Sequence, residues 1–122
     1  MDNKFYVSLD AARLLKEKGY NEEVELFYNT LGELEEVNGM FCCDVADNTQ
    51  MTKYNYCSAP TKAEAIDWLE SKGIVVEAFY TRHHWFFSII DFNVKQKIFA
   101  DEYYPTRLEA EEAAIIKALE LL

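Results

Sequence analysis

The sequence predicts an α+β fold: a single domain with pseudo-duplicated α-β-β-β units plus a C-terminal helix, and an antiparallel sheet packed by helices on one face. Two observations support this prediction. Stretches with helical periodicity alternate with extended stretches rich in β-branched and aromatic residues, and one helix-and-strand unit occurs twice. No linker rich in Pro, Gly or Ser separates the halves, so we expect one domain over residues 1–122.

The repeated unit reads AARLLKEKGYNEEVELFY at residues 11–28 and AIDWLESKGIVVEAFY at residues 65–80. The spacing shortens by two residues between the Gly and the Val of each copy, where a turn would absorb the change. Because repetition at a fixed period reflects a supersecondary unit that packs on its twin, we interpret it as architecture. The pattern predicts pseudo-repeats over about 8–60 and 61–105 and a closing helix over 106–122.

Capping residues mark the three predicted helix starts. Thr61 precedes Glu64 and Thr106 precedes Glu109, at the spacing of a capping box. Ser8 is a simpler cap of the same chemistry. The predicted helices cover about residues 9–18, 62–72 and 107–121, and the first two end at Gly19 and Gly73.

Extended segments lie between these helices. The predicted strands cover about residues 24–28, 36–43, 53–57, 74–81, 85–93 and 95–100. Hairpin turns are expected at residues 29–32 and 82–84, and only the first of them contains a Gly.

The charge of the chain is strongly acidic. Twelve Lys and Arg against 22 Asp and Glu give a formal net charge of −10. Such a field repels phosphate backbones and anionic lipids, so we expect neither nucleic acid nor a membrane as a partner. No apolar run reaches the roughly 18 residues of a membrane span, and the first residues lack the pattern of a signal peptide. We therefore expect a cytoplasmic protein, whose charge serves solubility.

Three cysteines fit that expectation. Cys42, Cys43 and Cys57 are an odd number without a secretion signal, which favours reduced thiols over a disulfide framework. They lack the C-x(2–4)-C spacing of structural zinc sites, so we interpret them as small hydrophobic residues.

His83 and His84 are the only histidines, and they fall in a predicted turn beside Trp85. A histidine titrates near neutral pH, so a small enzyme using His83 or His84 with Asp91 or Glu77 remains an alternative. Adjacent residues of an extended chain point to opposite sides, which favours a polar hairpin turn instead. No phosphate-binding loop, nucleophile elbow or metal-binding motif is present, and we predict no catalytic residue, metal or cofactor.

Tyrosines gather before the two Pro-Thr helix starts. Tyrosine combines a large apolar ring with a polar tip and is enriched at protein interfaces. The clusters would either form a binding patch or close the edge of the sheet against the helices, and the sequence leaves both open. The candidate binding residues are Tyr54, Tyr56, Tyr80, His83, His84, Trp85, Tyr103 and Tyr104.

Three segments carry a resemblance to a known family. They are YVSLDAARLLKEKGY at 6–20, APTKAEAIDWLESKGI at 59–74 and YPTRLEAEEAAIIKALELL at 104–122. They resemble a family of small uncharacterised (hypothetical) proteins of Bacteroides and related gut bacteria and of their phages and mobile elements. That family has no assigned activity, so the resemblance implies a context and transfers no site residue.

We expect a non-enzymatic module that binds a protein partner through its sheet face or its tyrosine-rich edge, and a homo-oligomer stays open. The main alternative is an acidic inhibitor that mimics nucleic acid in conflicts between phage and host. It would need the carboxylates of residues 22–25, 33–36 and 109–112 to form one stripe.

Overall fold

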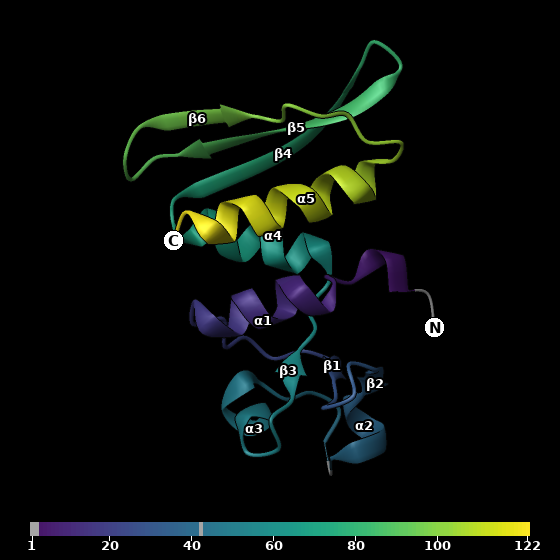
Figure 1. Cartoon of the computed structure of the whole chain (residues 1–122). Helices are drawn as coiled ribbons and strands as arrows, with labels where there is room; N and C mark the ends of the chain where they lie inside the picture. The colour runs from purple at the N-terminus through teal and green to yellow at the C-terminus, as the bar shows by residue number, and fades with distance from the viewer. Residues whose placement is uncertain (1–2, 42) are drawn as a thin grey trace. The chain divides into compact units, whose positions relative to one another are not determined.

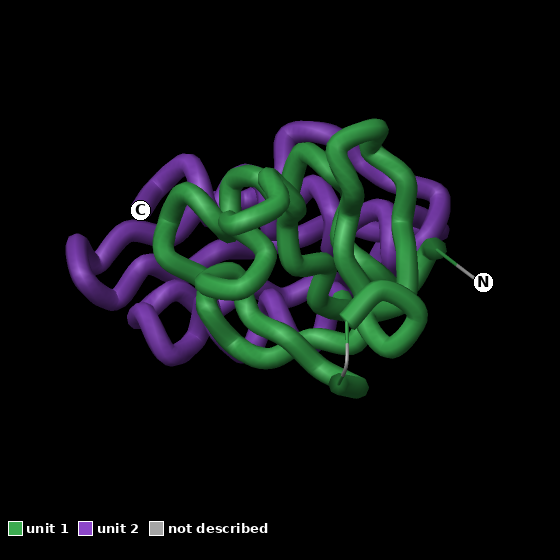
Figure 2. Tube along the Cα trace, turned by 90° about the horizontal axis from the view of Figure 1, so that it is seen from below, with its two compact units in different colours: residues 1–61 green, residues 62–122 purple. Residues whose placement is uncertain are grey.

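The computed structural model describes residues 3–41 and 43–122. These residues form five α-helices and two three-stranded antiparallel sheets, which confirms the predicted α+β class (Figure 1). The chain folds into two compact units, residues 1–61 and residues 62–122 (Figure 2). Their boundary follows Thr61, where the second predicted repeat begins. Whether the two units form the single predicted domain stays a prediction.

Unit 1 contains a small sheet between helices. Its elements are η1 (Asn3–Phe5), α1 (Leu9–Glu17), β1 (Leu26–Tyr28), β2 (Leu34–Glu36), α2 (Val37–Met40), α3 (Asn48–Thr52) and β3 (Cys57–Ser58). The strand order is β2-β1-β3, and both pairings are antiparallel. The Ser8 hydroxyl accepts the N–H of Ala11 at 3.2 Å, which confirms the predicted cap of α1. The hydroxyl of Tyr28 donates to the carbonyl of Val7 at 2.6 Å and ties β1 to the segment that enters α1.

Unit 2 is a three-stranded meander with both of its helices on one face (Figure 1). Its elements are α4 (Lys62–Ser71), β4 (Ile74–Thr81), β5 (His84–Asp91), β6 (Gln96–Phe99) and α5 (Arg107–Glu120). The strand order is β4-β5-β6. The helix α5 packs on β4, β5 and α4, as predicted for the C-terminal helix.

Both copies of the repeat begin with a helix that ends at a glycine in the left-handed region, as predicted. Gly19 has φ of 97° and Gly73 has φ of 84°. A Cβ at Gly73 would also lie 2.9 Å from the side chain of Asn93. That side chain donates to the carbonyl of Lys72 at 2.8 Å and so satisfies the C-terminal end of α4. Glycine is therefore required at residue 73 by its φ and by the space that Asn93 occupies.

Two predicted strands of unit 1 are wrong in position. The strand expected at 36–43 reaches only Glu36, because the chain turns into α2 at Val37. The strand expected at 53–57 is reduced to Cys57–Ser58. Before it lies α3, which begins with a capping box between Asp47 and Gln50. The D-x-x-Q spacing was the sequence signal for α3.

The strands of unit 2 lie close to their predicted ranges. The ladder between β4 and β5 runs from Ile74 opposite Asp91 to Thr81 opposite His84. The predicted turn is a two-residue turn in which Arg82 and His83 both have positive φ, 52° and 70°. Positive φ at both central residues defines a type I′ turn, whose twist matches that of the flanking strands.

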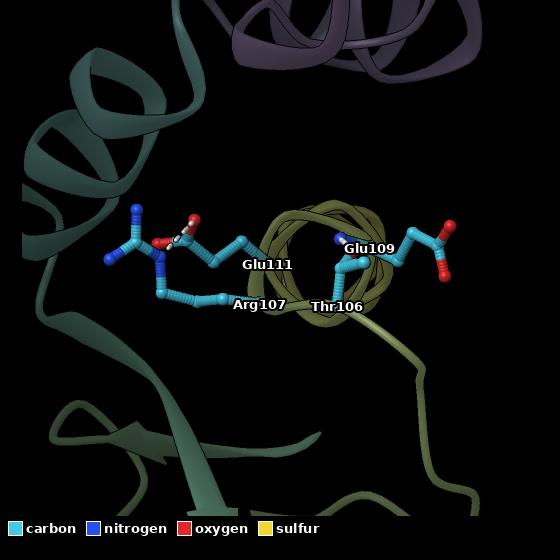
Figure 3. A network of polar contacts seen from close by, with 4 residues as sticks. All are labelled: Thr106, Arg107, Glu109 and Glu111. Atoms are coloured by element: carbon cyan, nitrogen blue, oxygen red, sulfur yellow. Dashed lines mark hydrogen bonds and ion pairs between the residues drawn. The ribbon is translucent and has the colours of Figure 1, made fainter. Parts of the chain in front are cut away.

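The last helix begins at the predicted cap. Thr106 accepts the N–H of Glu109 on its hydroxyl at 3.2 Å. The carboxylate of Glu109 extends away from Thr106, so one half of the predicted box is formed (Figure 3). Arg107 and Glu111 lie one turn apart, with Nε 3.7 Å from the carboxylate (Figure 3).

Candidate functional site

The face of the β4-β5-β6 sheet that turns away from α4 and α5 is the leading candidate site. We call it the open face. Residues that are opposite in an antiparallel ladder share a face, so its members follow from the register. They are Val75, Glu77, Phe79 and Thr81 of β4, His84, Phe86, Ser88 and Ile90 of β5, and Lys97 and Phe99 of β6.

The opposite face of the sheet is closed by the helices. Ile74, Val76, Phe87 and Ile89 point to that side and are buried. They meet the apolar side of α5, where residues such as Ile115 are fully buried. All of residues 62–122 are described, and no helix among them lies on the open face (Figure 1).

Aromatic rings dominate the open face. Phe79 and Phe86 stack across the two strands with ring centroids 6.0 Å apart. Phe99 of β6 is 59% exposed, and the ammonium of Lys97 lies 4.9 Å from its ring centroid. Large apolar side chains on a monomer's surface are normally scattered, so a contiguous set of this kind is unusual.

Few charges interrupt this surface. Glu77 and Lys97 have opposite sign and lie on the two outer strands, so their formal charges cancel. The chain as a whole carries −10. The centre of a protein interface is depleted of charged residues relative to the remaining surface, and the open face shows that depletion.

His84 and Tyr103, two of the predicted binding residues, border the open face. Their rings stack at 14° with centroids 4.0 Å apart. Tyr103 is 61% exposed, and it reaches His84 because the neighbouring Tyr104 bonds to Trp85 through both main-chain groups. This pairing extends the sheet past β6 and carries the segment of Tyr103 along β5.

Three other predicted residues lie on the helix side of the sheet. Tyr80 is opposite Trp85 in the ladder, and their rings are 5.4 Å apart. Tyr104 lies against Phe87 at 6.1 Å. His83 is at the tip of the type I′ turn and is exposed. The sheet therefore separates Tyr80, Trp85 and Tyr104 from His84 and Tyr103.

Tyr54 and Tyr56 belong to unit 1 and stack on its core. Tyr56 lies 4.8 Å from the ring of Phe27, and Tyr54 lies 5.5 Å from Tyr56. Asn55 between them has φ of 61°, a region that Asn tolerates better than most residues. Of the two interpretations left open, Tyr56 fits packing against the sheet. Tyr54 is the exposed end of the stack, at 54%.

The two copies of the repeat bury the same position differently. Phe27 of the first copy is fully buried together with Val37, Ala46 and Met51. Its counterpart Phe79 is half-buried, and its ring stacks on Phe86 of the neighbouring strand. Chain from the α2 and α3 segments covers this face in unit 1. In unit 2 only the short turn of residues 92–95 joins β5 to β6, and no helix of unit 2 covers this face.

Phe79, Phe86 and Phe99 were not among the predicted site residues. The signal for them was present in the sequence, since β4 and β5 carry large apolar residues at both parities. A strand with one solvated face alternates apolar and polar residues. Loss of alternation therefore predicts either two covered faces or one covered face and one docking surface.

The described hollows contain no catalytic arrangement. One of them has a volume of about 480 Å³ and is lined by Tyr6, Glu25, Leu26, Glu36, Asn38 and Asp44. Two others, of about 360 and 260 Å³, lie beside α5 and beside α3. None of the three is lined by His83 or His84.

Glu77 and Asp91, the carboxylates considered as partners of the histidines, lie away from them. Glu77 is opposite Ser88, four residues from His84 on β5, which is about 13 Å at the rise of a strand. Asp91 is buried at the far end of β5, where it accepts the N–H of Asn93 at 2.9 Å. Neither Glu77 nor Asp91 therefore lies beside His84.

Cysteines form no metal centre within the described part of the chain. Cys43 is exposed and Cys57 is partly buried, and both are free thiols. Cys42 lies outside the described residues. Among residues 3–41 and 43–122, no group of three or more His, Cys, Asp or Glu side chains could hold a metal ion.

The pKa of Tyr104 is raised above the ordinary value of a tyrosine. Burial raises the pKa of its phenol, and the nearby carboxylates of Glu102 and Asp101 raise it further. Both causes favour the neutral phenol. Glu102 and Asp101 make the surroundings of this tyrosine acidic.

Comparisons with known proteins add no relative. No protein-family model, curated protein or solved structure gave a significant match to the chain. Within the described residues, no helix combines the length and the apolar character needed to cross a membrane.

Proposed function

We propose that this chain is a non-enzymatic protein-interaction module that binds a protein partner on the open face of its β4-β5-β6 sheet. The observation that carries the proposal is the contrast between Phe27 and Phe79. The same position of the repeat is closed by the chain itself in unit 1 and left bare in unit 2. A partner would supply the cover that unit 2 lacks.

The chemistry of the face fits such a role. Hot spots of interfaces are large rings that lose all contact with water on binding, ringed by residues that contribute less. Phe79, Phe86 and Phe99 would be the central rings, and His84 and Tyr103 the rim. The partner surface should be apolar and close to neutral, since the face itself is nearly uncharged.

A cytoplasmic location belongs to the same proposal. Cys43 and Cys57 are free thiols, which suits a reducing compartment. The resemblance to proteins of gut bacteria and their mobile elements would give the context. Neither point identifies the partner.

Site-specific photo-crosslinking tests the proposal. A benzophenone amino acid replaces Phe79 in one variant and Leu31 in another, and both are expressed in the cells that encode the chain. Leu31 is the matched control because it is an exposed apolar residue in the turn between β1 and β2. We expect one discrete protein adduct from residue 79 that residue 31 does not produce.

Affinity measured with the identified partner then decides the assignment. Phe79→Glu should weaken binding by more than about tenfold, because it places a charge in the apolar centre. Leu31→Glu should leave binding unchanged, and circular dichroism should show both variants folded. Equal adducts at both positions, or unchanged affinity of Phe79→Glu, would contradict the proposal. An adduct of the chain with itself would assign the face to a homo-oligomer and reject a different partner.

The nucleic-acid mimic makes a different prediction. The carboxylates of residues 22–25 and 33–36 are neighbours in unit 1, because Leu26 pairs with Glu36. Those of residues 109–112 lie on α5 in unit 2. A mimic would bind its target less tightly as salt rises, whereas binding through the open face should survive high salt. A salt titration with the captured partner therefore separates the two functions.

A further inference from the structure

We infer that the outer edge of β6 and the groove beneath it bind an extended peptide segment that carries Lys or Arg on either side of an apolar side chain. This site lies on the helix side of the sheet and at its edge. It shares Lys97 and Phe99 of β6 with the open face, but its groove opens on the opposite side of the sheet.

The edge of β6 offers main-chain groups for a further strand. In an antiparallel pair, directly hydrogen-bonded residues alternate with residues whose N–H and C=O point away from the neighbour. Ala100 donates its N–H to the carbonyl of Phe87 at 2.9 Å, so the next bonded pair along the ladder is Ile98 with Ile89. Lys97 and Phe99 are then the residues whose main-chain groups face outward.

This edge is free within unit 2. The strand order β4-β5-β6 leaves one side of β6 without a neighbour, and every residue of 62–122 is described. Lysine on an edge strand often blocks pairing. The ammonium of Lys97 instead lies over the ring of Phe99, along the open face, and leaves the edge accessible.

A groove lies directly under this edge. Its volume is about 360 Å³. It exists because α5 packs mainly on β4 and β5, so that the inner side of β6 extends beyond the helix. The apolar lining includes Phe87, Ile98 and Phe99 of the sheet and Ala113 and Ile116 of α5. A strand added to β6 would direct every second side chain into this groove.

The rim of the groove selects basic neighbours for that side chain. Asp101 and Glu102 follow β6, Glu120 lies near the end of α5, and Lys117 is the one opposing charge among the lining residues. The pKa of Tyr104, which also lines the groove, is raised by burial and by Glu102 and Asp101. A second copy of this acidic chain would bring more carboxylates to the rim, so charge complementarity favours a basic segment of another protein.

Peptide binding to the full chain tests the inference. The probe is a short acetylated and amidated peptide in which Lys, Val and Lys occupy alternating positions separated by Thr, labelled for fluorescence anisotropy. The control peptide has Glu in place of both Lys residues. We expect the Lys peptide to bind at least about tenfold more tightly than the control.

Backbone methylation shows whether a strand is formed. Two versions of the Lys peptide carry N-methyl groups on the odd or on the even residues. Only one set of amides can face β6, so one version should lose at least about tenfold in affinity and the other should retain it. Equal losses or equal retention would overturn strand addition.

A variant of the edge completes the test. Lys97→Pro removes the outward N–H while leaving the pairing of β6 with β5 intact, because that N–H takes no part in the ladder. Lys97→Ala is the control, since it keeps the N–H and removes the charge. The inference predicts loss of peptide binding for the Pro variant only. It is overturned if both variants bind alike, or if the wild type is a dimer that only the Pro variant dissociates. Photo-crosslinking at residue 79 in the chain with Lys97 unchanged tests the open face separately.

Discussion

Phe79 and Phe86 face each other across β4 and β5, and their rings stack at 21° on the side of the sheet that carries no helix. Two large rings on a solvated face gain only part of the free energy that full burial would supply. In the first copy of the repeat, the corresponding Phe27 obtains that burial from Met51 and Val37. The two rings therefore keep exposed apolar surface that another protein could bury.

The repeated position allows a matched comparison of stability. Phe27→Ala should lower the free energy of unfolding by about 3–5 kcal/mol, because it leaves a cavity in the core of unit 1. Phe79→Ala should cost only about 1–2 kcal/mol, because that ring is only partly buried. Urea unfolding followed by circular dichroism measures both. Equal costs would mean that the open face is as well packed as the core.

The type I′ turn should allow substitutions that stabilise the fold. Arg82 and His83 both adopt positive φ, which costs a non-glycine residue about 1 kcal/mol. Replacing the pair by Asn-Gly should raise the melting temperature, since these residues favour both positions of the turn. Arg82→Lys with His83→Gln is the control, because it keeps two side chains with the same backbone penalty. A lower melting temperature for Asn-Gly would contradict the turn assignment.

Ser58 carries a buried hydroxyl with no hydrogen-bond partner among the described residues, and it is 1% exposed. Ser58→Ala should leave the stability unchanged or raise it by about 1 kcal/mol, because an unsatisfied polar group is removed. Ser8→Ala is the opposite case, since the Ser8 hydroxyl accepts the N–H of Ala11. It should cost about 1 kcal/mol. Thermal melts of the two alanine variants should move in these directions, and a destabilised Ser58→Ala would reveal a bond to water.

Tyr104 should make the fold sensitive to alkali. Its pKa in the folded chain is raised by burial and by Glu102 and Asp101. The unfolded chain, with a tyrosine pKa of about 10, then loses this proton first as the pH rises. The stabilising contribution is present below that pH and is lost as the pH rises through the folded value.

Two variants test this predicted loss of stability at high pH. Tyr104→Phe should lose less stability than the wild type between neutral pH and a pH above about 10. Glu102→Gln should bring the titration of the Tyr104 phenol, followed by its phenolate absorbance, toward its ordinary pH. An identical alkaline loss in wild type and Tyr104→Phe would exclude Tyr104 as its source.

Elements defined by local signals were predictable. Ser8 and Thr106 cap the helices that the sequence assigns to them, and Gly19 and Gly73 end the first two. These signals act within a few residues, because a cap satisfies orphan N–H groups of the same helix turn. The antiparallel hairpin of β4 and β5 followed in the same way from its apolar residues and its short turn.

The site was predictable in part. His84 and Tyr103 border the open face as two of the eight candidates, whereas Tyr80, Trp85 and Tyr104 lie on the other side of the sheet. Proximity in sequence could not separate them, because adjacent residues of a strand point to opposite faces. The register of the ladder was needed to sort them.

The sequence by itself determined the class of fold, the repeat, its caps and its acidic charge, because each depends on residue types and their spacing along the chain. Only the tertiary structure decided that Phe27 is enclosed while Phe79 is left open. That difference depends on which distant segments return to cover a face: the chain around Met51 does so in unit 1, and β5 and β6 extend the sheet sideways in unit 2. Burial is a property of the packed chain, so the same sequence motif can form core in one copy and surface in the other.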